Sequence, residues 1–467
     1  MQLLREAPRP AIVREHPLAP WFAVGTVCLG AFMGQLDASV VTLAFPALQR
    51  QYGVGLAGVQ WVSLGYLLAL IALLVPVGRW SDRAGRKLVY LQGFLVFTAA
   101  SAACGFAWSL PALIGLRILQ AAGAAMLQAN SVALVATSAP AGRRRAALGF
   151  QAAAQALGLG LGPVAGGVLL SLVGWRWIFF INVPVGVVAL AAGWFLLPRT
   201  RDRAPAEKAD PLGFGLLITT VAAALVAVSA ISGLGLPPWA IAGTAVIALS
   251  AGTGLGWWER RAAAPLIDLP TLAAGGMARG LAGAMCAYML LFGPLVAFPQ
   301  LLSARGDSPL RVGLILAALP VGFGLAAIAG ERLLPDHWPD RRRCILGAIL
   351  ATACAVALAG FGSTAVVVVL LGLLGVGLGV YLPANNAAIM AEVPAGGEAA
   401  AGGLVSMARG LGTALGVAAV AVALHAGASA GHPAAGRAPA MLTLAACGLA
   451  ALWASRAGRR AGRGIRM

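Results

Sequence analysis

Long apolar runs alternate with short polar segments along nearly the whole chain. A helix needs about 20 apolar residues to cross a bilayer. The charged residues gather between the runs, where loops would lie at a membrane surface. The pattern therefore predicts fourteen membrane-spanning helices, at residues 20–45, 56–77, 88–108, 110–139, 146–171, 176–198, 212–232, 238–257, 277–303, 310–332, 342–361, 363–391, 400–426 and 438–455.

The composition supports a membrane class. Of the 467 residues, 60% are hydrophobic and 10% are charged, whereas soluble domains carry about 25% charged residues. The 62 glycines and 27 prolines lie inside apolar runs, and both residues are more frequent in membrane helices than in soluble ones. We therefore expect an all-α polytopic protein embedded in a lipid bilayer.

The basic residues are distributed unevenly between alternate loops. Of the 33 Lys and Arg residues, 26 fall on the side of the N-terminus, five fall on the other side, and Arg117 and Arg409 lie inside runs. Cytoplasmic loops carry the excess of basic residues, so we expect both termini in the cytoplasm and the chain in the cytoplasmic (inner) membrane. Because the cations form short clusters between spans, the net charge of +18 indicates topology, and we expect no nucleic-acid partner.

An internal repeat divides the chain. A shift of 254 residues aligns Asp82 with Asp336 and Gly149 with Gly403. An offset that holds across several spans indicates duplication. The predicted organisation is a cytoplasmic tail at 1–19, a six-helix bundle at 20–198, a linker with two inserted helices at 199–276, a second six-helix bundle at 277–455 and a basic tail at 456–467.

Residues 78–87 read Gly-Arg-Trp-Ser-Asp-Arg-Ala-Gly-Arg-Lys, and we call them the latch loop. Asp82 can accept hydrogen bonds from a helix N-terminus or pair with an arginine. The loop resembles the one between spans two and three of the major facilitator superfamily. The resemblance implies two six-helix bundles with a substrate site between them near mid-membrane. It also implies a cytoplasmic gate made by Gly78, Asp82, Arg83, Gly85, Arg86 and Lys87.

Asp37 lies deep in the first span. A carboxylate in hydrocarbon is costly, so we expect it to face a cavity or to be protonated. The surrounding Leu-Asp-x-x-Val-Val-x-x-Ala-x-Pro resembles the first-span motif of fourteen-span drug:proton antiporters, which implies a role in proton coupling or cation recognition. A structural carboxylate bonded to neighbouring helices is the alternative.

Arg117 lies about 10 Å into the fourth span, at 1.5 Å per residue, and Asp37 lies at a similar depth. The two side chains can therefore pair or compete for a proton. Gln120 and Gln128 share the helix face of Arg117. In the family, the proton-transfer arginine occupies the position of Arg117; snorkelling to the outer surface is the alternative.

The fifth span contains a run of small residues four apart, which lets helices approach closely. Packing alone explains such spacing. However, Gly-x-x-x-Gly-Pro-x-x-Gly-Gly resembles the motif that marks antiporters in this superfamily. The residues of this motif are Gly158, Gly162, Pro163, Gly166 and Gly167.

Other polar and aromatic residues inside spans are candidates for a cavity lining, although packing or, for Arg409, snorkelling also explains them. The ten candidates are Gln35, Gln120, Gln128, Gln151, Gln155, Tyr288, Phe292, Asn385, Asn386 and Arg409.

These patterns predict a proton-coupled antiporter that exports amphiphilic or cationic drugs by alternating access. No phosphate-binding loop is present, so we expect no nucleotide, no cofactor beyond the proton gradient, no metal and no enzymatic activity. We also expect a monomer. A dedicated exporter of a metabolite made by the same cell remains an alternative, as does a membrane receptor or assembly partner that transports nothing.

Overall fold

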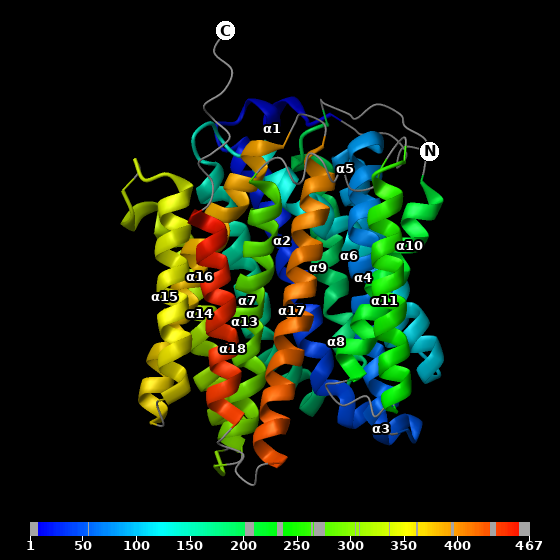
Figure 1. Ribbon diagram of the computed structural model, residues 1–467. Helices are drawn as coiled ribbons and strands as arrows, with labels where there is room; N and C mark the ends of the chain where they lie inside the picture. Colours follow the sequence, from blue (N-terminus) through cyan, green and yellow to red (C-terminus); the bar gives the residue numbers. More distant parts are fainter. Residues whose placement is uncertain are drawn as a thin grey trace.

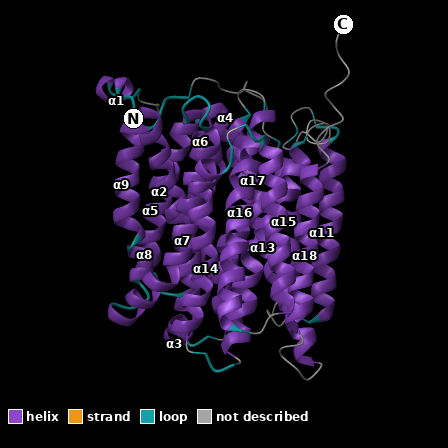
Figure 2. Ribbon diagram, turned by 90° about the vertical axis from the view of Figure 1, so that its left-hand side faces the viewer, coloured by secondary structure: helices purple, strands orange, loops and turns teal. Residues whose placement is uncertain are grey.

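The computed structural model describes residues 8–54, 56–200, 210–230, 237–262, 265, 276–303, 305–307, 309–335, 337–360, 363–393, 397–429 and 436–456. All regular structure in these residues is helical. Long helices run side by side between two faces and are joined by short loops (Figure 2). Within the described ranges, thirteen helices are long and apolar enough to cross a membrane. The all-α membrane class predicted from the apolar runs is confirmed.

Two bundles of six long helices make up most of the molecule (Figure 1). The first contains α2 (Ala19–Val40), α4 (Leu56–Ala84), α5 (Arg86–Gly105), α6 (Leu110–Ser138), α7 (Arg144–Leu172) and α9 (Asn182–Leu196). The second contains α13 (Met277–Ser303), α14 (Pro309–Leu333), α15 (Asp340–Gly360), α16 (Thr364–Glu392), α17 (Glu398–Ser429) and α18 (Arg437–Arg456). Helices α5, α6 and α7 begin 254 residues before α15, α16 and α17 respectively, the same offset that aligns the two halves of the sequence.

The inserted pair consists of α10 (Pro211–Ser229) and α11 (Pro238–Glu259). Leu217 and Val221 of α10 pack with Ile71 of α4 and Leu404 of α17, so the pair covers the junction between the bundles. Helix α11 is largely exposed and apolar, a surface suited to lipid. The expected span at 212–232 corresponds to α10, whose apolar stretch, Pro211–Ala227, is shorter than the other thirteen.

Two predicted spans are broken on the face opposite the latch loop. The span expected at 20–45 ends at Val40 and continues as a 3₁₀ turn (Val41–Ala44) and a short helix, α3 (Phe45–Tyr52), with a proline in its first turn. The span expected at 176–198 is divided into α8 (Trp177–Phe180) and α9. Proline lacks an N–H, so it fits the first turn of a new helix better than a helix interior.

Both described ends of the chain lie at the end of the bundle that carries the latch loop, which we call the latch face (Figure 1). The short helix α1 (Ala11–Glu15) lies there. Arg9 Nε donates to the carbonyl of Leu196 at 2.6 Å, and Arg341 Nε donates to that of Ser455 at 3.1 Å. Helices α3 and α8 lie at the opposite end, the far face.

Candidate functional site

Asp37 is fully buried inside the first bundle, one turn from the end of α2. Arg117 Nη1 of α6 donates to its Oδ2 at 2.7 Å. Gln120 Nε2 and Asn182 Nδ2 donate to its Oδ1 at 3.0 and 2.9 Å. Three side-chain donors thus surround the carboxylate, and hydrogen bonds that involve a charged group are stronger than those between neutral groups. The pairing that the sequence allowed for Asp37 and Arg117 is present.

Arg117 is also enclosed, with 1% of its surface exposed. Its Nη1 additionally donates to Gln120 Oε1 at 2.7 Å, and its Nε donates to the carbonyl of Val62 at 3.3 Å. Its guanidinium carbon lies 4.1 Å from the ring centroid of Tyr66, a cation–π contact. The guanidinium does not snorkel to the far face, because its partners hold it within the bundle.

Asn182 is a site residue to which the sequence assigned no role. The break between α8 and α9 places it at the first position of α9. Its Nδ2 also donates to Ser101 Oγ at 3.1 Å, and Ser101 in turn donates to the carbonyl of Phe179 at 2.9 Å. The sequence feature that could have identified Asn182 as a site residue is its position in an apolar run, two residues before Pro184. The asparagine thereby links Asp37 to α5 and α8.

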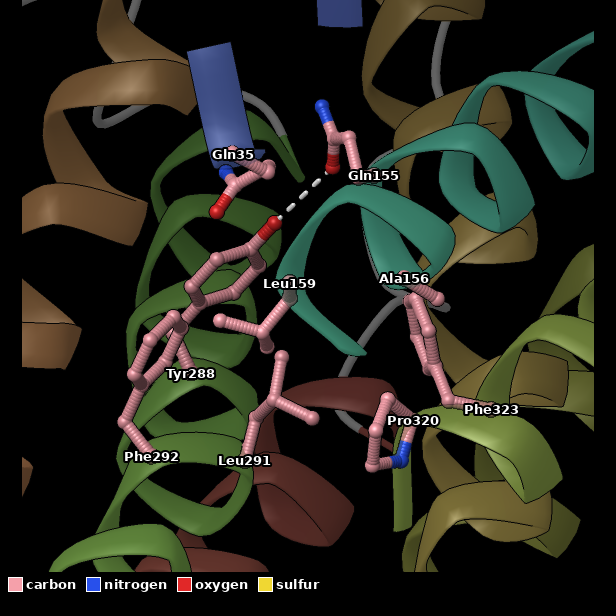
Figure 3. Close-up of a pocket in the computed structure, with 9 residues that line it drawn as sticks. All are labelled: Gln35, Gln155, Ala156, Leu159, Tyr288, Leu291, Phe292, Pro320 and Phe323. Carbon is pink, nitrogen blue, oxygen red and sulfur yellow. Dashed lines mark hydrogen bonds between the residues drawn. The ribbon is translucent and has the colours of Figure 1, made fainter. Parts of the chain in front are cut away.

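A pocket opens between the two bundles, about midway along the helices (Figure 3). In this conformation it is narrow, with a free volume of ≈ 10 Å³, about the room that one water needs. The rings of Tyr288 and Phe292 stack with centroids 6.0 Å apart, and Tyr288 Oη donates to Gln155 Oε1 at 3.2 Å. We call this the aromatic pocket, lined by Gln35, Gln155, Ala156, Leu159, Tyr288, Leu291, Phe292, Pro320 and Phe323.

A second pocket, equally narrow with a free volume of ≈ 10 Å³, shares Gln35 and Gln155 with the first. It is more polar and receives Arg409 from α17. We call it the arginine pocket, lined by Gly30, Ala31, Gly34, Gln35, Leu127, Gln128, Ser131, Gln155, Ser406 and Arg409. The two pockets adjoin at Gln35 and Gln155, and we refer to them together as the inter-bundle space, which has a polar part and an aromatic part.

Six of the ten candidate cavity residues line these pockets: Gln35, Gln128, Gln155, Tyr288, Phe292 and Arg409. The other four lie between packed helices. Gln120 belongs to the Asp37 cluster, Gln151 Nε2 donates to Ser131 Oγ at 2.5 Å, and Asn385 Nδ2 donates to the carbonyl of Gly280 at 2.9 Å. Asn386 is buried, with 1% of its surface exposed. None of the four lines either of these two pockets.

The latch loop joins the two bundles. Asp82 accepts hydrogen bonds from the backbone amides of Ala399 and Ala400, at 2.9 and 2.8 Å, at the N-terminus of α17. Arg86 Nε donates to Asp82 Oδ1 at 3.0 Å, and Arg86 also pairs with Glu398. A carboxylate at a helix N-terminus is favoured by the helix dipole and the free amides there. The bundles are therefore held together at the latch face.

The remaining latch residues lie where two helices join: α4 continues to Ala84 and α5 begins at Arg86, so the predicted loop is reduced to Gly85. Gly85 has φ of +116°, in the region that favours glycine, and it precedes the first residue of α5. A Cβ at Gly78 would come 2.5 Å from the carbonyl oxygen of Ala399, so α4 and α17 touch there. Lys87 Nζ donates to the carbonyls of Trp194 and Leu197 at 2.8 and 2.9 Å. Arg83 is half-buried.

A second pair crosses between the bundles at the same face. Arg145 of α7 pairs with Asp340 of α15 at 3.2 Å and donates to the carbonyl of Trp338 at 3.0 Å. Arg86 and Asp340 occupy equivalent positions of the repeat, 254 residues apart. The two bundles therefore contribute charges of opposite sign from this position.

Gly158, Gly162 and Gly166 form the face of α7 that packs on the first span. A Cβ on Gly158 would meet the carbonyl of Phe32, and one on Gly162 would overlap the side chain of Ser39. Gly167 faces open space. Pro163 is within α7, but its side chain lies outside the described residues. Close approach of α2 and α7 places Asp37 and the pocket residue Gln155 on two directly packed helices.

Among the residues that the structure describes, no three His, Cys, Asp or Glu side chains gather as a metal site. The chemistry available is instead a buried ion pair, a two-part pocket and a charged closure at one face.

Comparison with known proteins gives a consistent picture. The model of the Major Facilitator Superfamily matches residues 27–417 and 280–466. The Tetracenomycin C resistance and export protein of Streptomyces glaucescens is 31% identical over 415 residues, which cover 86% of this chain and 76% of that protein. The Multidrug resistance protein Stp of Mycobacterium tuberculosis is 33% identical over 405 residues, with coverage of 84% and 73%.

A solved structure extends the likeness to three dimensions. The human organic anion transporter MFSD10 superposes with a TM-score of 0.69 at 17% identity, covering 95% of this chain and 100% of that one. At this identity the similarity concerns the fold alone.

Proposed function

The chain belongs to the major facilitator superfamily, and on this premise we propose that it is a proton-coupled antiporter that exports amphiphilic, drug-like compounds. The relatives named for drug resistance and export support the direction and the substrate type. The buried pair of Asp37 and Arg117 supports the coupling to protons. The proposal includes a location in the cytoplasmic membrane with both termini in the cytoplasm, and a monomeric unit.

Asp37 carries the proton in this proposal. Ionisable residues inside membranes are rare and mark ion pathways. A proton that arrives on Asp37 neutralises the carboxylate and weakens its attraction to Arg117 at 2.7 Å. Arg117 and the two amide donors, Gln120 and Asn182, then have to rearrange, which changes how α2, α6 and α9 pack. Protonation is thus converted into a movement within the first bundle.

The substrate occupies the aromatic and arginine pockets. Asp37 lines neither of them, so proton and substrate have separate sites that share α2. Gln35 lies in the pocket wall two residues before Asp37. A shift of α2 upon protonation therefore changes the pocket directly.

The latch controls access. With both termini in the cytoplasm, the conformation described above is closed to the cytoplasm, and Asp37 is paired with Arg117 in it. An external proton then reaches Asp37 and favours release of substrate to the outside. When the latch opens, Asp37 gives its proton to the cytoplasm and a new substrate enters the pockets. No nucleotide or other cofactor is needed in this cycle.

The proposal rests on the buried pair of Asp37 and Arg117. A measurement of proton release on substrate binding tests the proposal. Purified protein in weakly buffered detergent solution receives a panel of amphiphilic antibiotics and dyes of both charge signs, and a pH indicator reports released protons. We expect release for the transported compounds and none for Asp37→Asn, with the exposed Glu15, replaced as Glu15→Gln, as the control carboxylate. Release that persists in Asp37→Asn would place the coupling proton on another group.

A transport assay separates export from binding. Everted vesicles with an imposed pH gradient should accumulate the compounds that release protons. Collapse of the gradient should abolish the accumulation. Accumulation without any proton gradient would exclude proton coupling.

A further inference from the structure

Arg409 is a buried cation that faces the inter-bundle space. It lies eleven residues after Glu398, the first residue of α17, which is about 16 Å from the latch face at 1.5 Å per residue. Only 8% of its surface is exposed, and its Nε is buried without a hydrogen-bond partner. Its guanidinium lies 5.4 Å from the ring centroid of Tyr288. Within the described ranges, no ion pair includes Arg409.

Other buried arginines contrast with Arg409. Arg117 pairs with Asp37, and Arg86 pairs with Asp82 and Glu398. A buried charge is normally compensated by an opposite charge or by hydrogen bonds, because its desolvation is costly. The cation–π contact of Arg409 compensates only in part. The guanidinium therefore has donor capacity left, and it lines the arginine pocket.

The lining of the two pockets contains no acidic residue. Around Arg409 it offers the neutral side chains of Gln35, Gln128, Gln155 and Ser131. On the other side, Tyr288 and Phe292 present stacked rings. The lining thus combines one positive charge, several neutral hydrogen-bonding groups and a flat aromatic wall.

Arg409 has an uncharged counterpart in the first bundle. Gln155 and Arg409 are equivalent positions of the two bundles, 254 residues apart, and both line the arginine pocket. Asp37 lies outside the pocket lining, where its three donors enclose it. Of the two buried charges, the pocket therefore receives only the cation.

We propose that the exported compound is a planar aromatic organic anion whose acidic group pairs with Arg409 while its ring system stacks on Tyr288 and Phe292. This inference rests on the proposed export function and narrows its substrate class; the cationic drugs predicted from the sequence are disfavoured. A planar guanidinium matches a carboxylate with two parallel hydrogen bonds. A cation placed in the same pocket would meet the uncompensated charge of Arg409. The depth of Arg409 separates this site from lipid headgroups at the latch face.

Two probes of the same shape and opposite charge test the proposal directly. They are 9-anthracenecarboxylate and 9-(aminomethyl)anthracene, whose binding to the purified full chain in neutral detergent is followed by fluorescence anisotropy at pH 7. We expect the carboxylate to bind at least about tenfold more tightly than the amine, since a hydrogen-bonded charge pair carries an affinity difference of this order.

Substitutions test whether Arg409 causes the preference for the carboxylate probe over the amine probe. Arg409→Gln should weaken carboxylate binding about tenfold or more and leave amine binding equal or stronger. Arg409→Lys keeps the charge without the planar fork, so the preference should persist in reduced form. Phe292→Leu should weaken both probes alike. The exposed Arg311, replaced as Arg311→Gln, serves as the control, and thermal unfolding of each variant verifies its fold.

Equal affinity of the two probes in the natural sequence would overturn the proposal, as would an unchanged preference in Arg409→Gln or the absence of binding by either probe. The binding assay needs no gradient, so Asp37→Asn should retain the preference for the carboxylate. Retained preference without gradient-driven transport would refute the export function while supporting the anion site. Gradient-driven export of cations that is indifferent to Arg409 would refute only the anion site.

Discussion

Asp37 and Arg117 are paired at 2.7 Å inside the first bundle, and neither side chain lines the inter-bundle pockets. A charge pair that substrate does not touch can respond to protons while the pocket responds to the transported compound. The link between the two sites is α2, which carries Asp37 on one face and Gln35 on the other.

Removal of Arg117 should destabilise the protein through its partner. Arg117→Gln leaves Asp37 as a buried carboxylate without its cation, and breaking such a pair costs about 3–5 kcal/mol. The double variant Asp37→Asn/Arg117→Gln removes both charges and should recover about half of the loss or more. Thermal unfolding in detergent measures both changes. If the double variant is destabilised by as much as the two single variants added together, the charges do not interact.

Asn182 should influence transport without affecting substrate binding. Asn182→Ala removes the 2.9 Å hydrogen bond to Asp37 Oδ1. A hydrogen bond to a charged group is worth about 1.5–3 kcal/mol. Because about 1.4 kcal/mol corresponds to a factor of ten, we expect gradient-driven transport to slow by roughly tenfold or more. The affinity for substrate should be unchanged. Asn182→Asp, which adds a second acid beside Asp37, should be at least as harmful, and a normal rate in both variants would argue against a role of Asn182 in coupling.

Two glycines of one motif should respond differently to the same change. Gly162→Ala introduces a methyl group into the space of the Ser39 side chain, whereas Gly167→Ala points into open space. Overpacking of a tight contact costs about 1–3 kcal/mol, so Gly162→Ala should lower the unfolding temperature. Gly167→Ala should leave that temperature unchanged or raise it slightly, because alanine favours the helix. Equal effects of the two changes would contradict the close contact of α2 and α7.

The latch should fail to close when α4 and α17 are held apart. In Gly78→Val, the Cβ alone would lie 2.5 Å from the carbonyl oxygen of Ala399. We expect the conformation open at the latch face to become more populated, because the contacts of Asp82 with α17 require this close approach.

Accessibility of the pocket measures this shift. A cysteine at Gln155, in a background without the six natural cysteines, should react faster with a membrane-impermeant maleimide applied from the latch face. Gly25→Val, with nothing near its added Cβ, is the matched control in α2. If both variants label at the same rate as the parent, the glycine contact does not control closure.

Exchange of a proton for an organic anion should respond to membrane potential. With one proton moving in for each monovalent anion moving out, two positive charges enter per cycle, and each is worth about 2.3 kcal/mol per 100 mV. A potassium diffusion potential, negative on the cytoplasmic side, should therefore accelerate export of an aromatic carboxylate in proteoliposomes. Exchange of a proton for a monovalent cation would be electroneutral and unaffected.

Features that depend on local composition could be predicted from the amino-acid sequence. Apolar runs identify the spanning helices because any spanning segment must be apolar over about 20 residues. The basic loops predict the topology, and the 254-residue offset in the sequence recurs in the starts of α5, α6 and α7 and their counterparts. Asp37 and Arg117 were detectable because charges inside apolar runs are costly and therefore uncommon.

The contacts between polar groups, by contrast, follow from how the helices pack in three dimensions. The spans are apolar all round, so their sequences do not indicate which face contacts lipid, another helix or a pocket. Gln120 consequently joins Asp37 while Gln128, two turns further along α6, lines the arginine pocket. Asn182 reaches Asp37 because the chain breaks between α8 and α9, and Arg409 faces the pocket because α17 packs against the first bundle. Such placements depend on contacts between segments far apart in the chain, which no local pattern encodes.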